Sequence, residues 1–329
     1  MKILTLRRIT QVAFFIIIIY GGYILSAYLD VKVVAPARGT EDEFNIVDFS
    51  LPVRSCRYIE PKPTLFKSCS VRYLADLPLY QPSWTSIGLT IVILLGLYIT
   101  FARFMCGWFC PLGFFTDMLD YIRQKLRIDR ITLPEKLRDF MRLWRYSFLV
   151  ALVLLSVAII LPFAYGIYMD KNFYAITCQV CPARTIIPIF GGTMPTAPSF
   201  FTPMTAVFST LSLIFLAIYI MGLFITRSWC RVCPNGTLSS LFSKGSLIVK
   251  EKDVRKCTKC GICKRTCPFE NNHVFEEKIK RNINHPNCIQ CFNCVEKCPE
   301  PDCLKVTFLG KTIFRSKYRD MRKPKRKNE

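Results

Sequence analysis

The chain has 329 residues, of which 51% are hydrophobic, and its 45 Lys and Arg against 23 Asp and Glu give a formal net charge of +22. A soluble domain seldom combines so many apolar residues with so much charge, which indicates that the two kinds of residue occupy different segments. The 17 cysteines and two histidines restrict the class to disulfide scaffolds and metal proteins, and the compartment decides between them.

Four uncharged apolar segments are long enough to cross roughly 30 Å of hydrocarbon as helices, which takes about 20 residues. These predicted spans are 9–29, 84–102, 146–169 and 203–226. The N-terminus, the loop 103–145 and the segment after the last span hold 36 Lys and Arg residues, whereas the loops 30–83 and 170–202 hold nine. Because positive charge marks the cytoplasmic side, we expect a multi-pass protein of the cytoplasmic membrane, in contact with lipid, with both termini inside.

After the last span, the spacing Cys-x2-Cys-x2-Cys-x3-Cys-Pro occurs twice between residues 257 and 299. Three thiolates at this spacing wrap a tight loop around three corners of a cubane, and the fourth cysteine of each motif ligates the other cluster. Zinc sites do not need the third cysteine and the trailing Cys-Pro, and the cytoplasm disfavours disulfides. The motif therefore predicts two [4Fe–4S] clusters, one held by Cys257, Cys260, Cys263 and Cys298, and the other by Cys288, Cys291, Cys294 and Cys267.

The segments that flank the two motifs, Leu247 to Val249 and Lys305 to Phe308, are typical of short strands that pair in a small α+β domain. The predicted fold is an α-helical membrane protein with four transmembrane helices, followed by a bacterial-type 2[4Fe–4S] ferredoxin-like domain. The predicted domains are a membrane domain (1–246), a ferredoxin domain (247–310) and a basic tail (311–329). Cys303 remains after the eight ligands, and we interpret it as a small buried side chain beside the second motif.

The second and fourth spans end in similar turns. One reads Arg103-x2-Cys106-x3-Cys110-Pro111, and the other reads Arg227-x2-Cys230-x2-Cys233-Pro234. Because both spans run from outside to inside, we expect all four cysteines at the cytoplasmic surface. Three interpretations stay open: a third metal or cluster site with the two arginines balancing thiolate charge, a redox-active dithiol pair, or turns that only terminate helices.

Four further cysteines fall in the loops predicted outside the cytoplasm. Cys56 and Cys69 lie in one loop, and Cys178 and Cys181 lie in the other. Thiols oxidise outside the cytoplasm, which favours disulfides. An even quartet with one Cys-x2-Cys-Pro unit is also consistent with an outer metal or cluster site, and unpaired thiols are the third alternative.

The combination of paired Arg-x2-Cys turns with a double ferredoxin motif, over roughly residues 84–300, resembles the membrane ferredoxins of the NapH and NosR type. The resemblance implies a quinol-dehydrogenase-like protein of a respiratory chain. Its partners would be quinone or quinol and a redox protein, such as a cytochrome or flavoprotein subunit. This sequence departs from the pattern in its second turn, which has Cys-x2-Cys instead of Cys-x3-Cys, and in the long loop between its first two spans.

The absence of several motifs narrows the range of cofactors that we expect. The sequence has no Cys-x2-Cys-His for c-type haem, no histidine in a predicted span for b-type haem, and no Ser/Thr-Gly-Ala-Thr signal for covalent flavin. We expect no nucleic-acid partner. The sequence thus predicts a membrane-bound iron–sulfur electron-transfer protein, a subunit of an oxidoreductase rather than a stand-alone catalyst. The alternative is a maturation factor that reduces a metal or disulfide for another complex.

Overall fold

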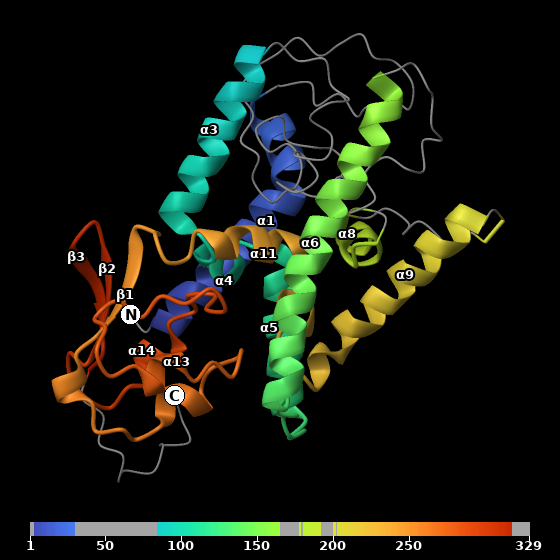
Figure 1. The fold of residues 1–329 in the computed structure, drawn as a ribbon. Coiled ribbons are helices and arrows are strands. Elements are labelled where there is room, and N and C mark those ends of the chain that lie inside the picture. Colours follow the sequence, from blue (N-terminus) through green and yellow to red (C-terminus); the bar gives the residue numbers. More distant parts are fainter. Residues whose placement is uncertain are drawn as a thin grey trace. The chain divides into compact units, whose positions relative to one another are not determined.

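The computed structural model describes residues 3–29, 84–164, 178, 180–191, 200–201 and 203–317, drawn in colour in Figure 1. Two compact units divide the chain. The first, here called the ferredoxin unit, comprises Met1–Gln11, Leu97–Phe109 and Ser239–Glu329. The second, here called the helical unit, comprises Val12–Gly96 and Cys110–Leu238.

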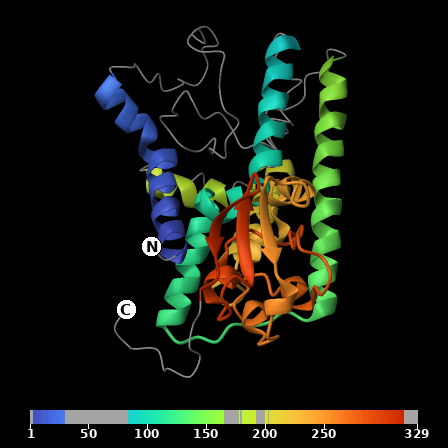
Figure 2. The ribbon, with the colours of Figure 1, turned by 90° about the vertical axis from the view of Figure 1, so that its left-hand side faces the viewer.

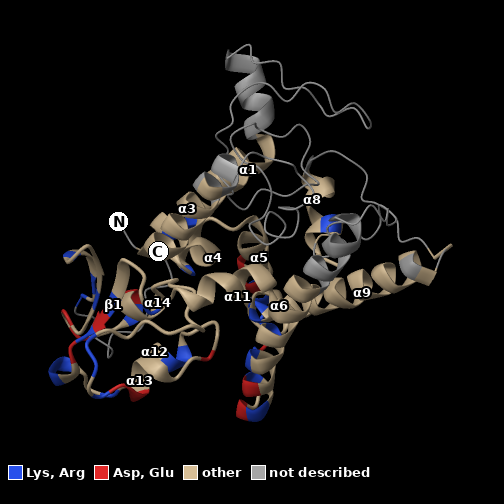
Figure 3. Cartoon of the chain, turned by 45° about the horizontal axis from the view of Figure 1, so that its top comes forward, with Lys and Arg blue, Asp and Glu red and all other residues tan. Residues whose placement is uncertain are grey.

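Helices occupy the described parts of all four predicted spans. They are α1 (Ile3–Leu29), α3 (Trp84–Phe101), α6 (Glu135–Ala164) and α9 (Pro203–Ile220). Helix α9 ends six residues before the predicted limit of 226, because the 3-10 turn η2 (Met221–Leu223) replaces its last part. Helix α6 begins earlier than predicted, in a charged stretch where Arg138 pairs with Glu135 at 3.2 Å. Figure 3 shows these charges gathered at one end of α6 and none on α9.

Within the described residues, two helical segments, Ile3–Tyr20 and Thr205–Leu223, are long and apolar enough to cross a membrane. A shorter apolar helix covers Ile91–Phe101. Only 28% of each long segment is buried in the protein, so most of its apolar surface lies outside the core. An apolar surface of this extent is costly in water and stable in hydrocarbon.

The helical unit is built around one apolar core, to which six of the described helices contribute. Besides α1, α6 and α9, these include α5 (Pro111–Lys125) and α8 (Ala183–Gly191). The short helix α10 (Ser228–Val232) adds Trp229 and Val232 to the same core. The most buried members are Ile18, Ile19, Phe115, Val180, Ile187, Tyr219 and Trp229. Because Val180 and Ile187 are buried, the segment around α8 folds inward onto this core.

The ferredoxin unit contains a three-stranded antiparallel sheet in the order β1-β2-β3, shown side by side in Figure 2. The strands are β1 (Ile248–Lys252), β2 (Leu304–Phe308) and β3 (Lys311–Arg315). Strand β1 pairs with β2 from Ile248↔Phe308 to Lys252↔Leu304, so the predicted pairing of the strands that flank the motifs is confirmed. Residues 311–315 were predicted as the start of the basic tail, but they form strand β3 and pair with β2. Residues 318–329 lie outside the described residues.

Residues from both ends of the chain and from its middle share the ferredoxin core. Ile3 and Trp108 pack with Ile283, Phe292 and Val306. The Leu4 amide donates to Glu296 Oε2 at 2.5 Å, and Trp108 Nε1 donates to the Gln290 carbonyl at 3.0 Å. The start of α1 and the short helix α4 (Phe104–Trp108) therefore fold with the domain predicted at 247–310.

Candidate functional site

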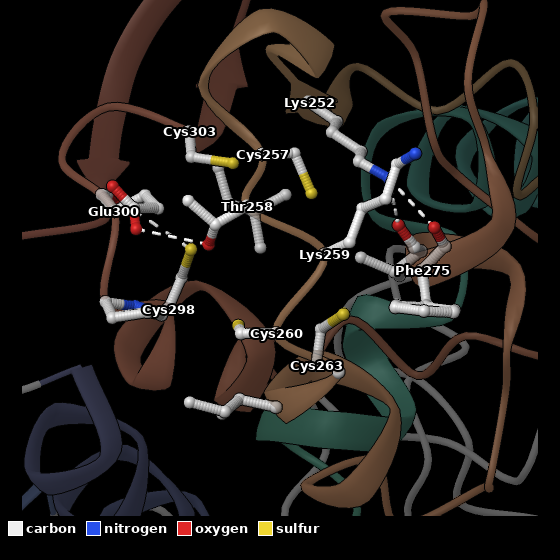
Figure 4. A pocket seen from close by; sticks show the side chains of 15 residues that line it. Lys252, Cys257, Thr258, Lys259, Cys260, Cys263, Phe275, Cys298, Glu300 and Cys303 are labelled. Carbon is white, nitrogen blue, oxygen red and sulfur yellow. Dashed lines mark hydrogen bonds between the residues drawn. The ribbon is translucent and has the colours of Figure 1, made fainter. Parts of the chain in front are cut away.

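Four cysteines from the two ends of the double motif line one cavity of the ferredoxin unit (Figure 4). They are Cys257, Cys260, Cys263 and Cys298. Cys257 and Cys260 lie on the loop that leads into helix α12 (Ile262–Arg265), and Cys263 is in its first turn. Cys298 follows helix α14 (Asn293–Lys297). Positive φ angles at Lys259 (54°) and Gly261 (73°) make this loop tight enough for the three thiols to converge. The structure thus brings together the set predicted for one cluster.

The cysteines of the second predicted set also lie close to one another. The charges of Cys288 and Cys291 act on both Cys267 and Cys294. Burial raises the pKa of Cys267 to about 11 and also raises the pKa of Cys294, and these neighbouring thiolates raise both further. A metal ion is the natural counter-charge for buried thiolates, because ligation removes the proton that burial would otherwise retain.

Two buried lysines of strand β1 approach the two sets. Lys250, 1% exposed, donates from Nζ to Cys288 Sγ at 3.2 Å. Burial by itself lowers the pKa of Lys250, but the Cys288 and Cys294 thiolates raise it above its ordinary value. Lys252 lines the first cavity and donates to the carbonyls of Val274 and Glu277, both at 2.8 Å. Neither lysine was predicted as part of the site, although residues at alternate positions of a strand share one face.

Cys303 has a closer relation to the first set than expected. It is 2% exposed, as predicted for a buried side chain, and it lines the same cavity. The Cys303 thiol donates to the Asp253 carbonyl at 3.6 Å. The interaction between the two sulfur groups lowers the pKa of Cys298 below its usual range and raises the pKa of Cys303. Cys303 therefore acts on a candidate ligand and is not only a space-filling residue.

The first Cys-Pro turn lies against the loop of the second set. A Cβ at Gly107 would collide with the Ile289 carbonyl oxygen, and the Gly107 carbonyl accepts hydrogen bonds from Arg7 (2.9 Å) and Gln11 (3.0 Å). Arg103, 1% exposed, donates to the Pro286 carbonyl at 2.7 Å and stacks over the Phe269 ring. One of the three open interpretations gave Arg103 a role in charge balance at the turn cysteines; the two contacts given above join it to the ferredoxin loops.

The four turn cysteines are divided between the two units. Cys106 belongs to the ferredoxin unit, where its Sγ lies 3.6 Å from Ser239 Oγ. Cys110, Cys230 and Cys233 belong to the helical unit. There Arg227, the N-cap residue of α10, pairs with Asp117 of helix α5 through two contacts of 2.8 and 2.5 Å.

The predicted outer quartet is described only in part. Cys56 and Cys69 lie outside the described residues. Cys181 packs against the same apolar core as Cys233. Its position on the outer side of the membrane stays a prediction. None of the cysteines that the structure describes forms a disulfide. In the same residues, no three His, Cys, Asp or Glu side chains are arranged to hold a single metal ion.

Two family models match the chain. A 4Fe-4S dicluster domain matches residues 249–299, which hold both ferredoxin motifs. A 4Fe-4S binding domain matches twice, at 83–129 and 207–254, and each match contains one Cys-Pro turn. The double match confirms that the two turns are copies of one repeated unit.

Several known proteins match over about two thirds of the chain. An uncharacterized protein of Methanocaldococcus jannaschii, MJ0750, is 27% identical over 67% of this chain and 79% of its own. The ferredoxin-type protein NapH of Escherichia coli is 24% identical over 62% of each chain. The regulatory protein NosR of Stutzerimonas stutzeri is 26% identical over 59% of this chain and 24% of its own. No solved structure matches the chain.

Proposed function

Since this chain is a polyferredoxin of the NapH and NosR type, we propose that it relays electrons between the quinone pool and a redox partner at the cytoplasmic membrane. The observation that carries the proposal is the cavity in which Cys298 of the second motif joins three cysteines of the first. This crossed arrangement is the one that two [4Fe–4S] clusters require. When bound, such clusters accept and release single electrons.

The eight ferredoxin cysteines are the proposed ligands. One set is Cys257, Cys260, Cys263 and Cys298, and the other is Cys288, Cys291, Cys294 and Cys267. Lys250 and Lys252 offset the negative charge of the two sets from within the protein. Neither lysine takes part in the reaction. Both place a positive charge beside the thiolates and beside the clusters that would accept electrons.

We further propose that all four predicted spans cross the membrane, with the ferredoxin domain in the cytoplasm. The apolar surfaces of α1 and α9, which remain largely outside the protein core, support this topology. The loop of the second cysteine set contacts the turn at the end of α3, through Gly107 and Trp108. This contact offers electrons a short protein path between that cysteine set and the end of a membrane helix.

The quinol step can be tested directly on the full chain, purified without oxygen in detergent. Oxidation of one quinol releases two protons and two electrons, which is one electron for each cluster. We expect menaquinol or ubiquinol analogues to produce the EPR signal of reduced clusters. A Cys288→Ser variant, which removes one ligand of one set, should lose part of that signal. No reduction by either quinol would overturn the quinone assignment and leave the iron–sulfur assignment intact.

A second function, reduction of a metal or disulfide for another complex, is favoured by one observation. Cys110 is the N-cap of helix α5, and a helix N-terminus stabilises a thiolate. If this function holds, a Cys110→Ser variant should lose the ability to reduce an added cupric ion or disulfide, whereas both ferredoxin clusters remain.

A further inference from the structure

Three Cys-Pro steps in the helical unit share one construction. They are Cys110-Pro111 before α5, Cys181-Pro182 before α8, and Cys233-Pro234 at α11 (Pro234–Leu241). In each, the cysteine carbonyl accepts a hydrogen bond from the first turn that follows: from Phe114, Arg184 and Thr237, all at 3.0 Å. The proline starts the helix at a position where no backbone N–H is needed. Each cysteine is thereby held at the N-terminus of a helix.

These cysteines converge around Tyr219. Its hydroxyl donates to the Leu112 carbonyl at 3.2 Å, which fixes it beside the Cys110 turn. The Tyr219 carbonyl accepts from Ser228 Oγ at 3.5 Å, so Tyr219 also lies beside α10, which holds Cys230. Tyr219 is buried in the same apolar core against which Cys181 packs. Cys233 follows Cys230 by one helical turn and packs against the same core as Cys181.

Two neighbours of these thiols suit an anionic, sulfur-rich ligand. Trp229, next to Cys230, is 3% exposed, and its indole Nε1 has no hydrogen-bond partner among the described residues. An indole N–H can only donate, and a buried donor is expected to have an acceptor. Arg227, 1% exposed, lies two residues earlier in the chain, where it pairs with Asp117 of α5.

We propose that Cys110, Cys181, Cys230 and Cys233 hold a third iron–sulfur cluster within the helical unit. The ligand set replaces Cys106 of the sequence-based set with Cys181, and it thereby unites the second turn with the segment before α8. Each cysteine releases its thiol proton when it binds iron. The inference goes beyond the proposed function, which needs only the two ferredoxin clusters.

Iron, zinc and acid-labile sulfide per chain, measured on anaerobically purified full-length protein, test the proposal. Four irons for each cubane give about twelve irons per chain with three clusters and about eight with two. We expect about twelve for the wild type and a loss of about four in Cys181→Ser and in Cys230→Ser. The matched controls are Cys178→Ser, in the same turn as Cys181, and Cys106→Ser, in the first Cys-Pro turn; both should keep about twelve.

Several results would overturn the third cluster. These are about eight irons in the wild type, zinc in place of the additional iron, full iron in Cys181→Ser, or a loss of about four irons in either control. If Cys181→Ser does not accumulate, the wild-type count and Cys230→Ser still decide. EPR separates the two proposals, because the ferredoxin signals should persist in every variant; a wild type with fewer than about eight irons contradicts the proposed function as well.

Discussion

Lys250 and Lys252 occupy alternate positions of β1, and both are buried on the face that carries the cysteines. Only Lys250 donates to a thiol, at 3.2 Å from Cys288; Lys252 is bound by carbonyls of Val274, Phe275 and Glu277. A hydrogen bond and a nearby positive charge stabilise the more negative, reduced form of a cluster. The two lysines should therefore affect the two cysteine sets unequally.

The Lys250→Met variant keeps the apolar stem and removes the ammonium group. We expect the midpoint potential of the cluster held by the Cys288 set to fall by about 59 mV or more, which is tenfold in the equilibrium constant for one electron. The other cluster should change much less. A redox titration followed by EPR measures both, and Lys305→Met on the neighbouring strand is the control for a general loss of positive charge. Equal shifts of the two clusters would argue against a specific effect.

Cys303 allows a similar test on the first set. Cys303→Ala removes the thiol whose interaction with Cys298 favours the Cys298 thiolate, so the potential of the cluster held by the Cys257 set should fall, with no loss of iron. Cys303→Ser retains a donor and serves as the matched control, with a potential near that of the wild type. If the alanine variant loses about four irons instead, Cys303 is itself a ligand.

At the scale of single residues, the ligand cysteines were predictable because their spacing has one chemical meaning. The buried lysines were not, because a lysine in a sequence is ordinarily read as solvent-exposed. The predicted first strand also stopped at Val249, one residue before Lys250, whereas β1 continues to Lys252. A strand extended by three residues would have placed both lysines on the face of Ile248.

Among the elements, the turn that contains Gly107 connects the end of α3 with a ferredoxin loop. Gly107→Ala places a Cβ against the backbone carbonyl of Ile289, which cannot move as a side chain would. We expect a loss of about 1–3 kcal/mol in stability, the usual cost of overpacking. Thermal unfolding in detergent should show a lower Tm. Gly245→Ala, in the same unit, has no atom within 4 Å of the added Cβ and should unfold as the wild type does.

Helices were predictable from long uncharged segments, but the position of the α8 segment was not. Loops were assigned to one side of the membrane or the other by counting spans, which places Cys181 and Cys233 on opposite faces. In the structure Val180 and Ile187 are buried with Phe115 and Trp229, and this burial draws Cys181 toward the second turn. A count of the charged residues in each loop gives no information on how a short apolar helix packs in the folded protein.

At the scale of the whole molecule, the ferredoxin unit is discontinuous in the chain. A domain boundary predicted from composition falls where apolar spans give way to charged residues, near residue 247. That criterion cannot reveal that Ile3 and Trp108, from segments predicted as part of the membrane domain, complete the core around Phe292. Contacts such as the hydrogen bond from Arg103 to the Pro286 carbonyl can be identified only in the folded structure.

The discontinuity predicts that the C-terminal segment is not self-sufficient. A fragment of Ser239–Glu329 should expose the surface of Phe292 that Trp108 and Phe104 cover, at ring distances of 5.9 and 6.0 Å. We expect the fragment to bind ANS and to lose its cluster absorbance in air faster than the full chain. A Phe292→Gln substitution should reduce ANS binding in the fragment, whereas in the full chain it should lower the Tm because it removes a buried aromatic contact. A fragment as durable as the full chain would show that α4 and the start of α1 do not stabilise the cluster-bearing fold.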